Sequence, residues 1–210
     1  RTCAEQSRYI ILAVKPQFYD GVLKEIQPVL DDSRIIISLA PSYSIADLKQ
    51  SLGSSVRIVR AMPNTPAMVG EGMTGLSWSD DDFSESERTE LMQFFTSFGK
   101  AETVPENLMD AVTAASGSSP AFIYMMIEAL ADGVVKYGMP RDKAYTFVSQ
   151  AVLGSAKMVL ETGEHPGLLK DNVCSPGGTT IAAVAELEAS GFRSSLIKAA
   201  SAVCDRCKNM

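Results

Sequence analysis

The chain has 210 residues, 46% of them apolar and 21% charged, which is typical of a globular protein with one large or two small domains. Its net charge is −6 at pH 7 without any cluster of Lys and Arg, so we expect neither nucleic acid nor an anionic membrane surface as a partner. No apolar run approaches the length of about 20 residues that spans a bilayer, and we expect no membrane span. Four cysteines without a visible signal peptide indicate a reducing compartment, the cytoplasm.

The first third of the chain alternates buried strands with amphipathic helices. Short apolar runs at 9–14, 34–40 and 55–63 each end near a proline, as strands buried on both faces of a parallel sheet do. Helical patterns separate them at 19–30 and 44–52. This alternation predicts the βαβ order of a doubly wound sheet.

Residues 72–104 complete the α/β part. The pattern predicts a strand at 72–78, a helix at 84–99 capped by Ser84, and a last strand at 100–104. We therefore expect a first domain over residues 1–103 with a Rossmann-like parallel sheet.

Residues 104–210 are predicted to form an all-α domain. Helical patterns cover 105–117, 120–138, 140–163, 179–191 and 192–209, and the first three start at a proline and close on a glycine. Their apolar stripes are wide, and small residues such as Ala129, Gly133 and Gly154 allow close packing. One protomer leaves such surface uncovered, so these helices predict a homodimer.

Ligands of open parallel sheets bind beyond the carboxyl ends of the strands, where this chain places turns at 13–17, 39–42 and 61–72. Two prolines stiffen the backbone around Asn64 and Thr65, which fits a polar ligand but also a plain connecting turn. Lys15 at a strand end suits either a phosphate or solvent.

Two other candidate groups have structural interpretations. His165 is the only histidine, with no evident Ser, Cys or carboxylate partner, and we interpret it as structural in a loop before Pro166. Cys204 and Cys207 form a CxxC without a second ligand pair, which favours ordinary thiols over a metal or redox site. We predict no metal site.

The segment DNVCSPGGTT, residues 171–180, interrupts helical sequence with helix-weakening residues. Gly177 and Gly178 allow a ligand to approach their amides, and Thr179 and Thr180 begin a helix whose free N–H groups attract an anion. Ser175 and Thr180 add hydroxyls. The segment fits an anion cradle, although an N-cap after a glycine hinge is the alternative.

The chain resembles the pyrroline-5-carboxylate reductases. The resemblance rests on four motifs in the family's order, namely AVKP, RAMPNTPAMVGEG, AASGSSPAF and HPGLLKDNVCSPGGTT. It implies hydride transfer from NADPH or NADH to the C=N bond of 1-pyrroline-5-carboxylate, giving L-proline. It also implies a dimer of interlocked C-terminal helices, with larger rings in some members.

The resemblance assigns roles to individual residues. The implied cofactor-binding residues are Ala13, Val14, Lys15, Pro16, Ala61, Met62, Asn64, Thr65 and Asn172. The implied substrate-binding residues are Ser175, Gly177, Gly178, Thr179 and Thr180. Thr180 is our candidate catalytic residue, as the hydrogen-bond partner of the imine nitrogen.

The family's Gly-rich G-x-G-x-x-G turn does not occur in this sequence, which lacks the first βαβ unit of that fold. We expect the parent protein to carry it. The alternatives are another two-domain NAD(P)-dependent reductase of the β-hydroxyacid dehydrogenase type and a helical dimerisation fragment without activity. The first uses a lysine in the first long helix of its helical domain as acid and base, and the comparable residues 116–133 contain none.

Overall fold

The computed structural model describes residues 1–209 and divides them into two compact units. The first comprises residues 1–120 together with those from 200 onward, and the second comprises residues 121–199. The units are described separately below.

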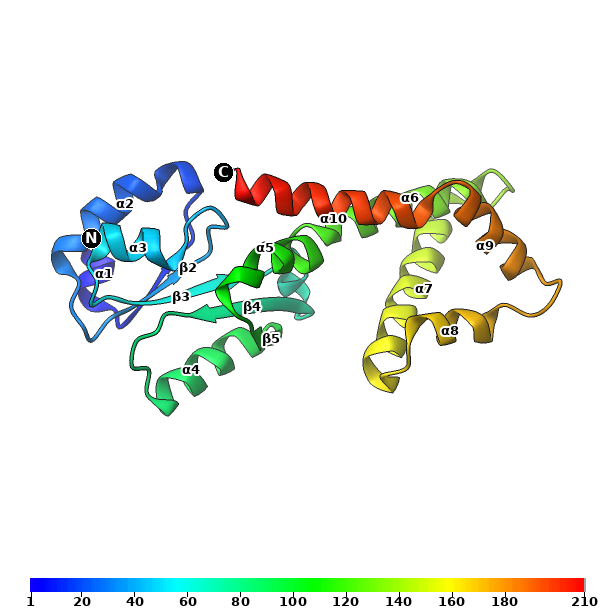
Figure 1. Cartoon of the computed structure of the whole chain (residues 1–210). Coiled ribbons are helices and arrows are strands. Elements are labelled where there is room, and N and C mark those ends of the chain that lie inside the picture. The colour runs from blue at the N-terminus through cyan, green and yellow to red at the C-terminus, as the bar shows by residue number, and fades with distance from the viewer. Residues whose placement is uncertain (210) are drawn as a thin grey trace. The chain divides into compact units, whose positions relative to one another are not determined.

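The first unit contains a five-stranded sheet in the order β1 (Tyr9–Leu12), β2 (Ile35–Ser38), β3 (Arg57–Met62), β4 (Gly72–Trp78) and β5 (Gly99–Thr103) (Figure 1). All five predicted strands are confirmed, but the expected all-parallel arrangement is wrong at one place. β4 runs antiparallel to β3, while the other neighbouring pairs are parallel. The connection between β3 and β4 holds only a short 3-10 helix, η3 (Thr65–Val69), and a parallel crossover needs a longer segment.

Helices cover both faces of this sheet. The chain forms α1 (Thr2–Gln6), α2 (Tyr19–Ile26), α3 (Ile45–Leu52) and α4 (Glu85–Thr96), with 3-10 turns η1 (Pro16–Phe18) and η2 (Gln27–Val29) flanking α2. Ser44 and Ser84 begin α3 and α4 with capping boxes, each accepting a hydrogen bond from the amide three residues later. The predicted cap at Ser84 is confirmed.

Neighbouring residues of β2 belong to two different hydrophobic clusters, one on each face of the sheet. Ile36 packs with α2 and α3 through Leu23 and Leu48, whereas Ile35 and Ile37 belong to the cluster that includes residues of α4. All three isoleucines are fully buried. A strand with both faces covered in this way needs an unbroken apolar sequence, which is the pattern found at 34–40.

Ion pairs of the buried Glu87 link α4 to Arg57 on β3 and to Arg8, which precedes β1. The Glu87 carboxylate accepts two hydrogen bonds from Arg57 Nη1, at 2.8 and 2.9 Å, and one from Arg8 Nη2 at 2.7 Å. It also accepts the Ser84 amide at 2.8 Å. Burial alone would raise the pKa of Glu87, but these donors outweigh it and lower the pKa to about 2.

The predicted helix at 105–117 is broken into three pieces. They are the 3-10 turn η4 (Glu106–Leu108), the short helix α5 (Met109–Val112) and the π-helix η5 (Thr113–Gly117). The π-helix widens the backbone turn, so that the amide of Ser118 bonds to the carbonyl of Thr113 at 2.8 Å.

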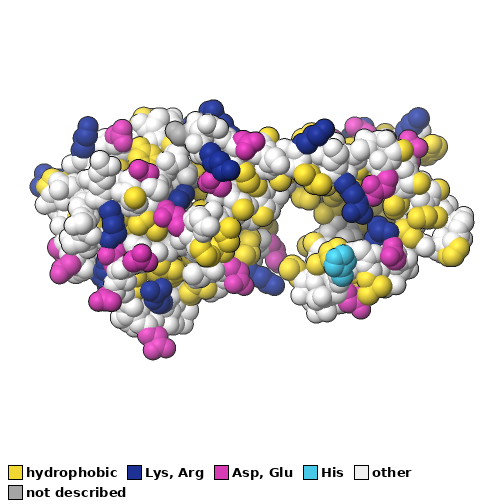
Figure 2. Space-filling model, in the orientation of Figure 1, with side chains coloured by type: hydrophobic (Ala, Val, Ile, Leu, Met, Phe, Trp, Pro, Cys, Tyr) yellow, Lys and Arg dark blue, Asp and Glu magenta, His cyan; other side chains and the backbone are white. Residues whose placement is uncertain are grey.

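Long helices follow, namely α6 (Ser119–Val135), α7 (Arg141–Thr162), α8 (Pro166–Val173), α9 (Thr179–Ala189) and α10 (Phe192–Lys208) (Figure 1). They confirm the helical character predicted for this half, and α8 is an additional helix. Within 121–199 only Ala131 and Ala144 are buried, while large apolar side chains including Tyr124, Met125, Phe147 and Leu160 are exposed. Figure 2 shows hydrophobic side chains spread over the surface of these helices.

Candidate functional site

The first candidate region lies beyond the carboxyl ends of β1, β2 and β3. These three strands are parallel, so the turns that follow Leu12, Ser38 and Met62 lie at one edge of the sheet. Ala13, Val14 and Lys15 are exposed there and Pro16 is half-buried as the first residue of η1. This edge is where an α/β sheet binds its ligand.

Ala61 and Met62 are the last residues of β3. They are buried, unlike the exposed residues of the turn after β1. Ala61 is 1% exposed inside the second core cluster, and Met62 is 8% exposed. Any contact from Ala61 to a ligand therefore comes from its main chain. Thr65, the first residue of η3, is exposed.

The Asn64 side chain is occupied by protein contacts. Its Oδ1 accepts the Met73 amide at 2.9 Å and its Nδ2 donates to the Ser116 carbonyl at 3.1 Å. These bonds tie the stiff turn to β4 and to the π-helix. The side chain thus fixes the loop, and the loop presents Thr65.

The π-helix is a feature of this region that sequence reasoning missed. A Cβ built on Gly117 would lie 3.7 Å from the Cγ and Sδ of Met62, so the segment passes the end of β3 closely. π-helical turns are rare and occur often at functional sites. The only signal was the small, polar sequence ASGSS within an otherwise helical pattern.

The second candidate region is the connection from α8 to α9, residues 174–178. Asn172 is exposed in the last turn of α8, and the Gly178 amide bonds to the Ser175 carbonyl at 3.0 Å to form a tight turn. Gly177 adopts φ +69°, a left-handed conformation that glycine tolerates best.

Gly178 is the N-cap of α9 and offers no side chain to cap it. The first-turn amides at Thr179 and Thr180 have no preceding helical turn to bond to, and the helix dipole makes this end positive. A Cβ at Gly178 would lie 2.5 Å from the Ser175 Oγ and 3.1 Å from its carbonyl. The Ser175 hydroxyl therefore needs glycine at this position to remain beside the free amides.

The arrangement can hold a small carboxylate. Uncapped amides supply hydrogen-bond donors, and Ser175, Thr179 and Thr180 add to the same stretch three hydroxyls that can donate and accept. Ser175 and Thr179 are exposed and Thr180 is half-buried. The site contains no strong acid or base among these residues.

His165 caps α8. Its Nδ1 accepts the Gly167 amide at 3.1 Å, and Pro166 occupies the first helical position. The interpretation of His165 as structural is confirmed, although it starts a helix and does not lie in a plain loop.

The two thiols of the CxxC lie on α10. Cys204 Sγ donates to the Asp110 carbonyl at 3.7 Å, and burial raises the pKa of the Cys207 thiol. Over residues 1–209, no group of three His, Cys, Asp or Glu side chains is placed to hold a metal ion. Within the same residues, no helix is both long and apolar enough to cross a membrane.

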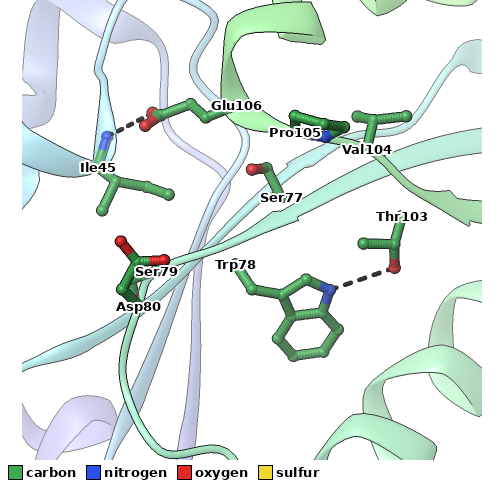
Figure 3. Close-up of a pocket in the computed structure, with 9 residues that line it drawn as sticks. All are labelled: Ile45, Ser77, Trp78, Ser79, Asp80, Thr103, Val104, Pro105 and Glu106. Atoms are coloured by element: carbon green, nitrogen blue, oxygen red, sulfur yellow. Dashed lines mark hydrogen bonds between the residues drawn. The ribbon is translucent and has the colours of Figure 1, made fainter.

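A cavity of about 480 Å³ lies elsewhere in the first unit (Figure 3). The side chains of Ser77, Trp78 and Thr103 line it, and the Trp78 Nε1 donates to Thr103 Oγ1 at 3.3 Å. On another side, Glu106 accepts both the Ile45 amide at 2.7 Å and Arg60 Nη1 at 2.9 Å. No residue that the sequence assigned to cofactor or substrate lines this cavity.

The predicted site residues fall into two groups. The residues of the cofactor set from Ala13 to Thr65 belong to the first unit, at one edge of its sheet. Asn172 and the whole substrate set belong to the second unit, at the junction of α8 and α9. Each group therefore lies within a single unit.

Comparisons with known proteins cover almost the whole chain. Residues 106–210 match the family model for pyrroline-5-carboxylate reductase dimerisation. The pyrroline-5-carboxylate reductase of Escherichia coli K12 is 48% identical over 196 residues, 93% of this chain and 72% of that enzyme. The soybean (Glycine max) enzyme of the same name is 42% identical over 205 residues, 98% of this chain and 74% of that enzyme.

A solved structure agrees with these relatives. The Plasmodium falciparum pyrroline carboxylate reductase, with NADP bound, superimposes with a TM-score of 0.92 at 35% identity, covering 98% of this chain and 78% of that one. The similarity includes both the sheet-containing part and the helices. The chain belongs to the pyrroline-5-carboxylate reductase family.

Proposed function

We propose that this protein reduces 1-pyrroline-5-carboxylate to L-proline, the last step of proline biosynthesis, with NADPH or NADH as the hydride donor. Family membership supports the reaction, and the Plasmodium falciparum relative with NADP bound supports NADPH as the first choice. The observation that carries the proposal is the uncapped start of α9, in a stretch of sequence that contains Ser175, Thr179 and Thr180. Such a cradle suits the carboxylate of a small amino-acid precursor.

The turns at the carboxyl edge of the sheet fit a nicotinamide cofactor. Lys15 is an exposed cation after β1, suited to a phosphate, and exposed Ala13 and Val14 can lie against a flat apolar group. The Asn64 contacts hold the second turn rigid, so Thr65 meets the cofactor without a loss of loop entropy. Pro16, Ala61, Met62 and Asn172 complete the proposed cofactor set. The bound cofactor supplies the hydride.

The protein's own residues orient the acceptor. In our proposal the free amides of Thr179 and Thr180 hold the substrate carboxylate, with Ser175 and the backbone of Gly177 and Gly178 shaping the turn. The Thr180 hydroxyl accepts a hydrogen bond from the protonated ring nitrogen, which holds the carbon of the C=N bond facing the hydride donor. A protonated cyclic imine already accepts hydride well, so placement supplies most of the catalysis and no strong base is needed.

We further propose that the protein acts as a homodimer through residues of 104–210, the proposed substrate-binding and dimerisation domain, with residues 1–103 as the cofactor domain. The exposed apolar side chains between 121 and 199 support this, because water contact with so much apolar surface is costly. Assembly of dimers into a ring extends the same proposal. The free cysteines and the biosynthetic role favour the cytoplasm.

The alternatives gain no support from the relatives. A ketol-acid reductoisomerase and a semialdehyde dehydrogenase NAD-binding protein resemble this chain at 12% and 15% identity, which reflects the fold alone. The test is NADPH oxidation by the purified full-length protein, followed at 340 nm with and without 1-pyrroline-5-carboxylate. We expect oxidation that depends on this substrate and yields proline stoichiometrically. A chain that binds NADPH but leaves the substrate unreduced would refute the proposal and favour a non-catalytic dimerisation role.

A further inference from the structure

The carboxyl ends of β1 and β2 are joined through one buried hydroxyl, that of Tyr19. This residue begins α2 and is 0% exposed. Its hydroxyl donates to the Leu12 carbonyl at 2.8 Å and accepts the amides of Leu39 and Ala40 at 3.2 and 3.1 Å. One donated hydrogen and two accepted ones satisfy this buried phenolic hydroxyl.

These partners lie where the pairing of β1 and β2 ends. The paired register of β1 and β2 ends at Leu12 opposite Ser38, and that of β2 and β3 ends at Ser38 opposite Arg60, so Leu39 and Ala40 lie beyond the last pairs. Polar main-chain groups beside a buried edge need partners. The Tyr19 hydroxyl is a hydrogen-bond partner for main-chain groups of both strand ends. The Ser38 hydroxyl also lies 3.2 Å from the Tyr19 oxygen.

The turn that carries Lys15 lies between these attachment points. Leu12 precedes it and Tyr19 follows it, and within it the amides of Phe18 and Tyr19 bond to the carbonyls of Lys15 and Pro16. These two main-chain hydrogen bonds close the turn at its Tyr19 end. The Tyr19 hydroxyl bonds to the Leu12 carbonyl and so joins this end of the turn to the other. The other turn, after β2, is held because the Tyr43 ring stacks on Tyr19 with centroids 4.7 Å apart.

We propose that Tyr19 is a positioning residue for the cofactor, which fixes the Ala13–Pro16 turn to the end of β2 in the geometry that binds it. This inference rests on the proposed function of that turn. Tyr19 is fully buried, so it acts through the turn and does not touch the cofactor. Removing the hydroxyl frees the Leu12, Leu39 and Ala40 groups and loosens the turn before any ligand binds.

The test is Tyr19→Phe, which keeps the ring and its stacking on Tyr43. We expect the KM and the dissociation constant for NADPH to rise ~10-fold, with kcat at saturating NADPH changed by less than ~2-fold and the KM for 1-pyrroline-5-carboxylate unchanged. A hydroxyl needed only for stability would lower the melting temperature without this selective effect on NADPH. An NADPH dissociation constant equal to that of the wild type would overturn the proposal.

Tyr43→Phe is the matched control. The Tyr43 hydroxyl donates to Asp20 Oδ1 at 2.8 Å and to no strand end, so its loss should leave NADPH binding unchanged. NADPH binding is titrated by fluorescence, which needs no turnover. A wild type that binds NADPH without reducing the substrate counts against the proposed reaction, while Tyr19→Phe still reports on the turn.

Hydrogen exchange of the wild type tests the same contact if Tyr19→Phe does not fold. The Leu39 and Ala40 amides should exchange as slowly as those within β2, although they lie beyond its last pair. Rapid exchange at these two amides would show that Tyr19 does not hold the turn and would overturn the proposal.

Discussion

Thr180 is the residue on which the proposed chemistry depends most. Thr180 is half-buried and combines a first-turn amide of α9 with a hydroxyl, and residues 175–180 contain no Asp, Glu, His, Lys or Arg. Thr180→Ala should lower kcat by roughly 10- to 100-fold, because without the hydroxyl at its nitrogen the imine is no longer held in the orientation for hydride transfer. The measurement is steady-state NADPH oxidation, with sedimentation to confirm the same mass. Thr180→Ser, which keeps the hydroxyl, should retain most of the activity, and unchanged kinetics in Thr180→Ala would remove the hydroxyl from the mechanism.

Gly178 tests the shape of the cradle. Its added Cβ would meet the Ser175 hydroxyl at 2.5 Å, so Gly178→Ala should push Ser175 aside. We expect the KM for 1-pyrroline-5-carboxylate to rise ~10-fold while NADPH binding stays the same. Gly21→Ala is the control, since nothing lies within 4 Å of its Cβ on α2. Equal substrate KM values in the two variants would show that Ser175 does not belong to the site.

At the scale of elements, α4 depends on the ionised state of Glu87. Its pKa is about 2 in the folded protein, below the ordinary value of 4.5, so ionisation stabilises the fold. This contribution, roughly 3 kcal/mol, is complete above pH 4.5 and is lost as the pH falls towards 2. Glu87→Gln should therefore lower the free energy of unfolding at pH 7, and the difference from wild type should shrink between pH 4.5 and 2.

Urea unfolding at several pH values measures this difference. Glu85→Gln is the control, because Glu85 is exposed in the same turn of α4. A deficit in Glu87→Gln that persists unchanged at pH 2.5 would contradict the assignment of the stabilisation to the carboxylate.

The elements also show where sequence reasoning succeeds. The strands at 9–14, 34–40 and 55–63 were predictable because burial on both faces demands runs such as Ile35–Ile37. The direction of β4 was not, because direction depends on the path of residues 63–71 and not on the strand's own pattern. The π-helix at Thr113–Gly117 was also hidden, because helical periodicity does not report one widened turn.

The candidate site was predictable only in part. The glycine-rich turn before α9 could be recognised, because Gly177 and Gly178 have few other uses there. The role of Tyr19 could not be recognised from the sequence, because an aromatic residue at the start of an amphipathic helix is usually just a part of the hydrophobic core. Its hydroxyl bonds to groups more than 20 residues apart from one another, from Leu12 to Leu39, which only the fold brings together.

At the scale of the whole molecule, the apolar surface of residues 121–199 predicts assembly. A hollow of about 550 Å³ is lined almost entirely by apolar side chains, among them Met125, Ala129 and Leu196. Ala129→Asp would bury an unpaired charge in any interface formed there, so we expect the dimer to dissociate into monomers. Sedimentation velocity measures the mass.

Thr89→Asp adds the same charge to the exposed surface of α4 and should leave the dimer intact. A wild-type sedimentation profile for Ala129→Asp would place the interface elsewhere.

The most direct test of the account is a crystal structure of the protein with L-proline and oxidised NADP bound. We predict that the proline carboxylate accepts hydrogen bonds from the free amides of Thr179 and Thr180 at the start of α9, with its ring nitrogen bonded to the Thr180 hydroxyl and its C5 facing the nicotinamide. Proline bound away from the start of α9, or with its carboxylate on other groups, would contradict the account.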